Sequence, residues 1–159
     1  MANHSTFFES PLGIIQVRCD DQYVTSIKFL DSSDDLVMED HSLLNRSVQQ
    51  LKDYFSGNRL EFDLPLLQAG SEFQQKIWTL LLQIPFGKTL SYKQLTAQFG
   101  DMKAIRAVAS ANGKNDLAIV VPCHRVIGTN GSLTGYAGGL WRKKWLLEHE
   151  AKFRQGVIF

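Results

Sequence analysis

The tetrapeptide Pro122-Cys123-His124-Arg125 holds the residue types with the most obvious chemistry in this sequence. A cysteine is a strong nucleophile only as the thiolate, and a neighbouring imidazole or guanidinium favours that form. On an ideal strand, Cys123 and His124 would point to opposite faces, so a working pair needs a bend at Pro122 or a bridging water. The alternative is a buried structural cysteine beside an unrelated histidine, because a free cysteine usually packs as a small hydrophobic residue.

The segments on either side of the tetrapeptide predict what positions it. Upstream, the apolar run Leu117–Val121 ends at Pro122 and predicts a buried strand. Downstream, five glycines fall between positions 128 and 139, which is too many for regular structure. The backbone there must turn tightly or approach another group closely, so this loop is a second candidate site. A last helix is expected from Leu140 to about His149.

Three further helices are expected before this region. Ser71-Glu72-Phe73-Gln74 and Ser91-Tyr92-Lys93-Gln94 have the capping-box form that begins a helix. A third helix, from about Met102 to Ala111, consists largely of small residues around Arg106. A short helix, a tight turn and a second helix predict a helix-turn-helix, although many helical hairpins with this outline bind nothing.

The first 70 residues have a different pattern. Residues 6–9, 13–19 and 23–29 are rich in β-branched and aromatic residues and predict a meander of three strands. Helical spacing of apolar residues predicts a helix from Ser42 to Gly57, and residues 62–64 suggest one more strand. Residues 65–70 break the pattern, so we expect an N-terminal α/β domain over 1–70 and a second domain over 71–159.

Composition and charge narrow the class of protein. The chain of 159 residues is 44% hydrophobic and 21% charged, as expected of a folded protein. No apolar run exceeds five residues and the N-terminus lacks a signal sequence, so we expect a cytoplasmic protein without membrane contact. The first domain carries 5 Lys and Arg against 11 Asp and Glu, and the second carries 12 against 5. The basic second domain is either a surface for a polyanion or a partner that neutralises the first domain.

Five stretches in the second domain carry a family signature. They resemble the O6-alkylguanine-DNA alkyltransferases, in the short bacterial form without a regulatory domain. The likeness is close over residues 71–151, and Glu9–Gly13 is the best match before that. It implies an α+β fold, with a ribonuclease-H-like N-terminal domain and a winged helix-turn-helix in the C-terminal domain. The stretches are 106–108, 111–115, 119–128, 135–140 and 145–150.

The resemblance implies a single direct transfer of an alkyl group from O6 of guanine to Cys123. The product is a thioether, which offers water no carbonyl to attack, so each molecule acts once as a suicide enzyme. His124 matches the general base of the family, which acts on the thiol through a water molecule. Glu150 matches the carboxylate that orients this histidine, as in a catalytic triad. Outside the family, Glu150 would be interpreted as a solvated residue near a helix end.

The resemblance also implies which residues bind the substrate. Tyr92 matches a tyrosine that donates a proton to the base, and Lys143 matches a pocket lysine. Tyr136 and Ala137 match pocket residues, and Asn115 matches the residue that ties the helix-turn-helix to the active-site segment.

The resemblance also implies a second group of residues, which bind DNA. A base inside a duplex must be flipped out to react, and Arg106 matches the arginine that takes its place in the stack. The small residues Ala107 and Ser110 beside it suit close approach to a minor groove. The expected partner is duplex DNA carrying O6-alkylguanine, with O4-alkylthymine as a further substrate. The protein is expected to be a monomer without a cofactor.

The sequence departs from the family pattern at three points. Asp116 stands where the family usually has proline, so local stiffness is lost. Ala137 stands where some relatives carry serine, which would widen the pocket or alter substrate preference. Some relatives bind zinc through two cysteines and two histidines, but Cys19, His4 and His41 do not match those positions, so no metal is expected.

Two other functions stay open on the sequence. A helix-turn-helix protein with a reactive cysteine could be a DNA-binding regulator that senses oxidation or alkylation. Alternatively, Cys123, His124 and Glu150 could form the centre of a cysteine hydrolase.

Overall fold

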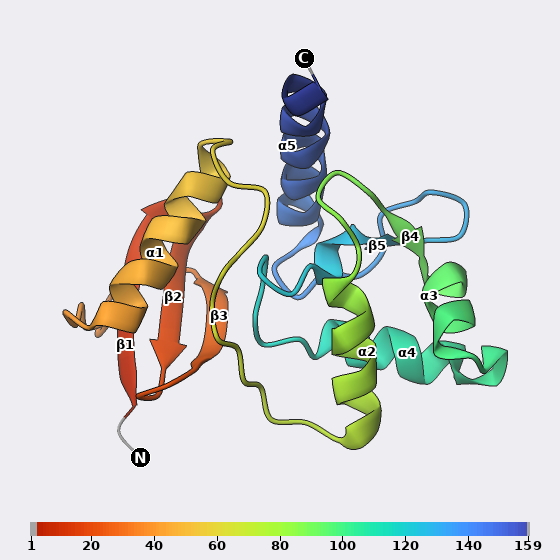
Figure 1. The fold of residues 1–159 in the computed structure, drawn as a ribbon, viewed down its shortest axis with the longest axis horizontal. Coiled ribbons are helices and arrows are strands. Elements are labelled where there is room, and N and C mark those ends of the chain that lie inside the picture. Colours follow the sequence, from red (N-terminus) through yellow and green to blue (C-terminus); the bar gives the residue numbers. More distant parts are fainter. Residues whose placement is uncertain (1–2, 159) are drawn as a thin grey trace. The chain divides into compact units, whose positions relative to one another are not determined.

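The computed structural model describes residues 3–158, with side chains described through residue 154. The chain divides into two compact units (Figure 1). Unit 1 comprises residues 1–68 and 116–118, and unit 2 comprises residues 69–115 and 119–159. The combination of a strand-rich first part and a helical second part confirms the predicted α+β class.

Unit 1 is a three-stranded antiparallel sheet with one helix packed against it (Figure 1). The strands are β1 (His4–Ser10), β2 (Gly13–Cys19) and β3 (Val24–Leu30), in the order β1-β2-β3, and the helix is α1 (Ser42–Phe55). Alternate residues of β2, including Ile15 and Val17, are buried, as are Leu44 and Leu51 of α1. The predicted meander and helix are therefore confirmed.

Two predicted strands are wrong, and a single bridge to β3 is found in or just after each segment instead. In place of a strand at 62–64, Leu66 pairs with Val24. In place of the strand at 117–121, Leu117 alone pairs with Ile27, and the chain then enters a turn in which Ile119 has a φ of 72°. The apolar run correctly indicated burial, but burial of a β-branched residue does not require extended backbone.

Unit 2 begins with α2 (Glu72–Leu82), α3 (Tyr92–Phe99) and α4 (Ile105–Gly113). Both predicted capping boxes are formed, at Ser71 and at Ser91, and Gly100 ends α3 in the left-handed conformation with a φ of 102°. The third predicted helix starts as a 3₁₀ turn, η1 (Met102–Ala104), before α4. The indole of Trp78 on α2 donates to the carbonyl of Ala111 on α4 at 2.9 Å, which ties the two helices together.

The rest of unit 2 holds the short elements around the predicted nucleophile. They are β4 (Leu90–Ser91), the 3₁₀ turn η2 (Cys123–Arg125), β5 (Val126–Ile127) and the long helix α5 (Leu140–Ile158). Strands β4 and β5 pair in parallel. The turn η2 follows the buried segment 117–121 and leads directly into β5. Helix α5 was expected to end near His149, but it continues for two more turns and places Glu150 in its middle.

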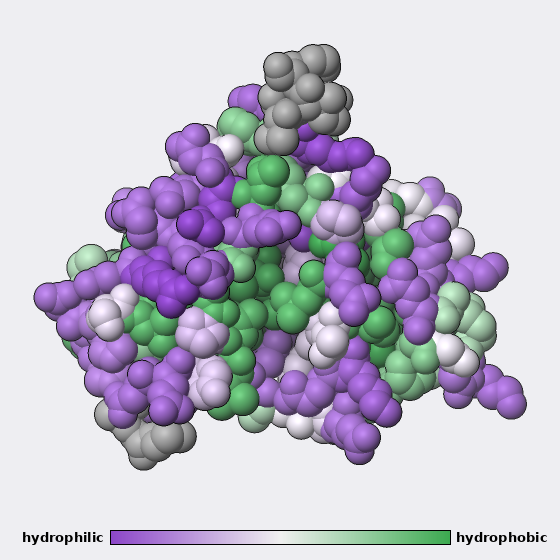
Figure 2. Space-filling model, in the orientation of Figure 1, coloured by the Kyte–Doolittle hydropathy of each residue, from purple (hydrophilic) through white to green (hydrophobic). Residues whose placement is uncertain are grey.

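Hydrophilic residues cover most of the face shown in Figure 2, and hydrophobic residues form smaller areas between them. Among the described residues, no helix has both the length and the apolar character needed to span a bilayer.

Candidate active site

The chain bends at Pro122, immediately before the predicted nucleophile. Pro122 has φ −83° and ψ 62°, and the N–H of Cys123 donates to the carbonyl of Val121 at 2.8 Å. This is an inverse γ-turn, and the 3₁₀ turn η2 follows it. Cys123, His124 and Arg125 are thus not on a strand, and all three are buried. Of the two ways in which the cysteine and histidine could work together, the structure supplies the bend.

Glu150 is the most completely bonded group of the site. Its side chain is buried, and four donors converge on its two oxygens. Oε1 accepts from Arg125 Nε at 2.8 Å and from the N–H of Gly87 at 3.2 Å, and Oε2 accepts from His124 Nε2 at 2.6 Å and Arg125 Nη2 at 3.0 Å. Burial alone would raise the pKa of Glu150, but the contacts with His124 and Arg125 outweigh it and hold the pKa well below its ordinary range. Glu150 is therefore a fixed negative charge.

His124 is held in one tautomer by this carboxylate. Because Nε2 donates its proton to Glu150, Nδ1 carries the lone pair, and among the described residues Nδ1 has no hydrogen-bond partner although it is buried. Burial lowers the pKa of His124, an effect that the charge of Glu150 only partly offsets, so the imidazole is neutral. The site thus presents a neutral base whose charged form would be stabilised by an adjacent carboxylate.

Cys123 is a buried thiol at rest. Burial raises its pKa, while a hydrogen bond from Asn115 and the charge of Lys143 act in the opposite direction. The thiolate is consequently scarce at neutral pH, and a proton acceptor is needed to form it. The amide of Asn115 also donates to the carbonyl of Val121 at 2.8 Å, which links the end of α4 to the Pro122 bend.

Three more predicted residues, Tyr92, Tyr136 and Lys143, interact electrostatically with Cys123. Burial raises the pKa of Tyr92 and raises that of Tyr136 further, and the proximity of Cys123 adds to both effects. Lys143 is fully buried, and its ammonium donates to the carbonyls of Val126 at 2.5 Å and Thr134 at 2.9 Å. Burial lowers the pKa of Lys143, and the nearby Cys123 partly offsets this effect. Lys143 therefore also ties the middle of the glycine-rich segment to strand β5.

The predicted DNA-binding residues lie on one exposed face. Arg106, Ala107 and Ser110 of α4 are exposed, whereas Val108 and Ala111 of the same helix are buried against the unit. Ala137 is also exposed, in the segment between β5 and α5.

Asp116 makes contacts that proline could not make. Its N–H donates to the side-chain oxygen of Gln68 at 2.9 Å, and its carboxylate lies 3.5 Å from the Lys28 ammonium. These bonds fix the backbone of residue 116 within unit 1 and replace part of the stiffness that a proline ring would give.

The sequence analysis considered Arg125 only as a cation that could favour the thiolate, and it missed the roles of Gly87 and Asn112. Arg125 clamps both oxygens of Glu150 and also donates to the carbonyl of Ile84 at 2.6 Å. Gly87 supplies a backbone donor from a left-handed conformation with a φ of 80°. Asn112 is buried and donates to the hydroxyl of Tyr92 at 3.4 Å. The only available signal was the position of Arg125 beside His124, because the other two act through contacts distant in sequence.

The fold and the site together define a class of α+β protein in which the helices α3 and α4 and the buried residues Cys123, His124 and Glu150 share one unit. Comparison with known proteins identifies the family. Residues 72–152 match the 6-O-methylguanine DNA methyltransferase DNA binding domain, and residues 3–68 match the ribonuclease-like domain of the same proteins. The chain belongs to the 6-O-methylguanine DNA methyltransferase family, and its enzyme class is that of the methylated-DNA–protein-cysteine methyltransferases.

Relatives match over nearly the whole chain. A methylated-DNA–protein-cysteine methyltransferase of Mycobacterium tuberculosis H37Rv is 42% identical over 151 residues, which is 92% of either chain. The constitutive enzyme of Bacillus subtilis is 43% identical over 144 residues, covering 86% of this chain and 87% of the relative. The crystal structure of M. tuberculosis OGT in complex with DNA has a TM-score of 0.86 and 42% identity, with 94% of each chain covered.

Proposed function

We propose that this protein repairs duplex DNA by moving the alkyl group of O6-alkylguanine irreversibly to Cys123, once per molecule. The observation that carries the proposal is the buried series Cys123, His124 and Glu150, in which the histidine bonds Glu150 through Nε2 and its buried Nδ1 has no partner among residues 3–154. O4-alkylthymine, with a related alkylated oxygen, is a further substrate. The protein acts as a cytoplasmic monomer, and the division into domains 1–70 and 71–159 places the whole reacting centre in the second.

The first step is formation of the nucleophile. The proton of the Cys123 thiol passes to Nδ1 of His124, directly or through a water, and the imidazolium is stabilised by Glu150 across the 2.6 Å hydrogen bond. The sulfur then attacks the alkyl carbon. The new S–C bond forms as the C–O6 bond breaks, and the electron pair of the broken bond stays on the guanine.

The leaving guanine must be neutralised. Tyr92, which accepts a hydrogen bond from Asn112, is the donor that protonates or hydrogen-bonds the base. Its raised pKa keeps the hydroxyl protonated until charge develops on the guanine. Tyr136, Lys143, Asn115 and the exposed Ala137 are the further residues proposed to bind the alkylated base. The thioether has no route back to the thiol, so the reaction ends there.

The reaction is tested by incubating the protein with duplex DNA that carries O6-methylguanine and measuring the intact mass of the protein. We expect one methyl group per chain, located on Cys123 by peptide mapping. DNA binding without a mass change would favour a regulator. Continuous ester or amide turnover would favour a cysteine hydrolase.

Arg106→Ala should separate repair of the duplex from the chemistry itself. Arg106 is exposed on α4, where it can fill the space of a flipped nucleotide. Because unstacking a base costs a few kcal/mol, we expect loss of this substitute to slow transfer from duplex DNA by about tenfold or more. Reaction with free O6-benzylguanine, which needs no flipping, should be nearly unchanged. Both rates are measured under single-turnover conditions.

Lys103→Ala is the matched control, because it removes a cation from the 3₁₀ turn that precedes α4. We expect it to weaken DNA binding slightly and to leave the ratio of the two rates as in the wild type. Equal losses on both substrates in Arg106→Ala would show that Arg106 has a structural role instead.

DNA affinity should fall as salt rises. The second domain carries 12 Lys and Arg against 5 Asp and Glu, and its cations displace counterions from DNA phosphates. Between 50 and 200 mM salt we expect affinity to fall by roughly tenfold for every two phosphates contacted. Fluorescence anisotropy with a labelled duplex measures this slope. An affinity that does not change with salt would contradict a phosphate-binding surface.

A further inference from the structure

Trp141 is a large aromatic residue that has no part in the alkyl transfer proposed above. It lies in the first turn of α5 and is 56% exposed. Single apolar side chains are common on protein surfaces, so exposure alone indicates no role for it. The feature that distinguishes Trp141 is the pair of contacts that its ring makes with neighbouring residues.

The ring of Trp141 contacts the backbone before the helix and the side chain after it. A β-carbon at Gly139 would lie 3.4 Å from Cδ1 of Trp141, so the indole packs directly against this glycine. The guanidinium carbon of Arg142 lies over the same indole, 4.6 Å from the ring centroid, which is within the range of a cation–π interaction. The indole therefore restricts where the guanidinium can lie.

From this position Arg142 holds a turn of the glycine-rich segment. Its Nη1 donates to the carbonyl of Gly138 at 2.8 Å. Gly138 lies within the four-residue turn 136–139, which is closed by a bond of 2.8 Å from the N–H of Gly139 to the carbonyl of Tyr136. A free arginine side chain has many rotamers, and ordering it costs entropy. Because the indole already limits these rotamers, less entropy is lost when Arg142 bonds to the turn.

The turn carries Tyr136 and Ala137, two of the residues that we propose to bind the base. The charge of Arg142 acts to lower the pKa of the Tyr136 phenol, against the larger opposite effect of burial. Cys123 acts on the pKa of the same phenol. Arg142 is thus close enough to influence the phenol that also interacts with the proposed nucleophile.

The residue after Arg142 holds the other end of the turn. The Lys143 ammonium donates to the carbonyls of Thr134 at 2.9 Å and Gly135 at 3.3 Å, which directly precede the turn. Arg142 bonds within the turn itself, at Gly138. Two successive side chains of α5 therefore fix the turn, and Trp141 restricts one of them.

We propose that Trp141 is a positioning residue for the alkylated base: it holds Arg142 against the turn 136–139, which in turn keeps Tyr136 and Ala137 in place. This role rests on the alkyl transfer proposed above. Trp141 acts through Arg142 and not on the base itself, so its loss should weaken binding of the base more than the transfer step.

The test measures the single-turnover reaction of the full-length protein with free O6-benzylguanine, with the rate recorded against the concentration of the base. In Trp141→Ala we expect the half-saturating concentration to rise about fivefold, as for the loss of a cation–π interaction. The maximal rate should stay within about twofold of the wild type, because separate contacts of Arg125 and Asn115 hold the reacting centre. A merely structural loss would instead lower the reacting fraction of the protein and leave the half-saturating concentration unchanged.

Further variants test whether Trp141 acts through Arg142. Trp141→Phe keeps a ring face for the guanidinium and should bring the half-saturating concentration back to within about twofold of the wild type. Arg142→Ala removes both the stack and the bond to Gly138, so it should raise that concentration by about tenfold or more. Because the two side chains act in series, the double variant should be no worse than Arg142→Ala alone.

Lys144→Ala is the matched control for charge. Lys144 lies on the same helix, its side chain is 68% exposed, and its ion pair in the described chain is with Glu148. The loss of this cation should leave the reaction with the free base as in the wild type. A loss equal to that of Arg142→Ala would mean that net charge, and not the bond to the turn, causes the effect, and it would overturn the proposal.

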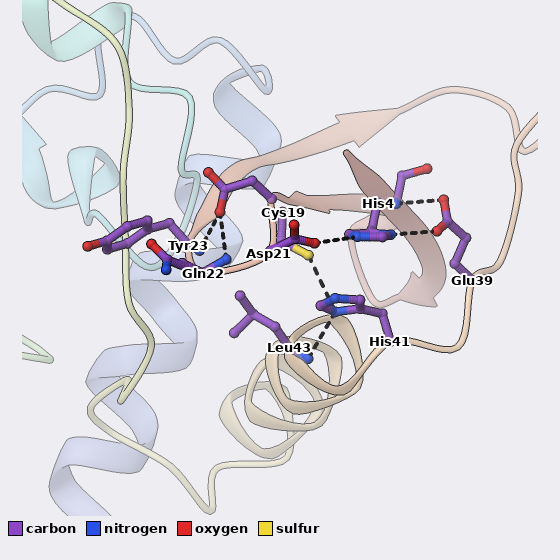
Figure 3. Close-up of polar contacts among 10 residues, drawn as sticks. His4, Cys19, Asp21, Gln22, Tyr23, Glu39, His41 and Leu43 are labelled. Carbon is purple, nitrogen blue, oxygen red and sulfur yellow. Dashed lines mark hydrogen bonds and ion pairs between the residues drawn. The ribbon is translucent and has the colours of Figure 1, made fainter. Parts of the chain in front are cut away.

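His4→Ala is the control for stability. The two ring nitrogens of His4 lie 3.1 Å from Glu39 Oε2 and 3.0 Å from Asp21 Oδ1 in unit 1 (Figure 3). The loss of both contacts should lower the midpoint of thermal unfolding. The half-saturating concentration should not change, since none of these residues is proposed to bind the base.

The possible failures can be told apart. If the wild type reacts with neither O6-benzylguanine nor O6-methylguanine in duplex DNA, the alkyl transfer and the role of Trp141 are both wrong. If the wild type reacts and Trp141→Ala has the same half-saturating concentration, only the role of Trp141 is overturned. A loss confined to duplex DNA would also overturn it, because the indole would then contact the DNA and not position the turn.

Discussion

Cys123→Ser is expected to abolish alkyl transfer while leaving DNA binding within about twofold of the wild type. The serine hydroxyl ionises far less readily than a thiol, and the neutral His124 is too weak a base to compensate. We expect the single-turnover rate to fall by roughly a thousandfold or more, as when other nucleophiles are removed. Intact mass after incubation with O6-methylguanine duplex measures transfer, and anisotropy measures binding.

Cys19→Ser is the matched control, because Cys19 is the second buried cysteine of the chain and lies in unit 1. The Cys19→Ser variant should accept one methyl group at Cys123, as the wild type does. Methyl uptake by Cys123→Ser at a rate near that of the wild type would contradict the assignment of the nucleophile. Uptake lost only in Cys19→Ser would move that assignment to unit 1.

Elements defined by local interactions were predictable from the sequence. The helix starts at Ser71 and Ser91 follow from capping boxes, which involve residues only three positions apart. The strand predicted at 117–121 failed because hydrophobicity reports burial and not backbone conformation. Ile119 satisfies burial in a turn with a φ of 72°, which a β-branched residue rarely adopts and which no sequence pattern signals.

In the site, too, features that depend on neighbouring residues were predictable, whereas contacts between distant segments were not. The sequence indicates that Cys123 and His124 are adjacent and that a working pair needs a bend at Pro122 or a bridging water, but only the structure shows that the chain does bend there. The clamp of Glu150 by Arg125 and Gly87 joins segments 25 and 63 residues apart, so only the folded chain reveals it. The family resemblance gave Glu150 a role, and the structure supplies the physical reason that its charge is maintained when buried.

Glu150→Gln should slow transfer by about tenfold to a hundredfold at neutral pH. The amide can still accept from His124 Nε2, but it lacks the charge that stabilises the imidazolium formed when Cys123 loses its proton. The rate should recover as pH rises and Cys123 ionises without help. Because burial raises the pKa of Cys123, this recovery should occur above the ordinary thiol value of about 8.5. Single-turnover rates from pH 6 to 10 measure both effects.

The same variant should lose stability, since removing the carboxylate leaves the buried guanidinium of Arg125 without its counter-charge. Breaking a buried ion pair in this way costs about 3–5 kcal/mol. The folded pKa of Glu150 is depressed, so its contribution is present above the unfolded value of about 4.3 and is lost as pH falls below it. The difference in unfolding free energy between wild type and variant should therefore shrink in acid.

Glu148→Gln and Glu150→Asp separate catalysis from folding. Glu148 lies on the same helix, and its side chain is 68% exposed. Its one ion pair within the described chain is with Lys144, so the Glu148→Gln variant should match the wild type in rate and stability. Glu150→Asp keeps the charge at a shorter reach and should recover part of the rate. Rates are compared per folded molecule at each pH. Identical pH profiles for wild type and Glu150→Gln would show that Glu150 only holds Arg125 and takes no part in forming the thiolate.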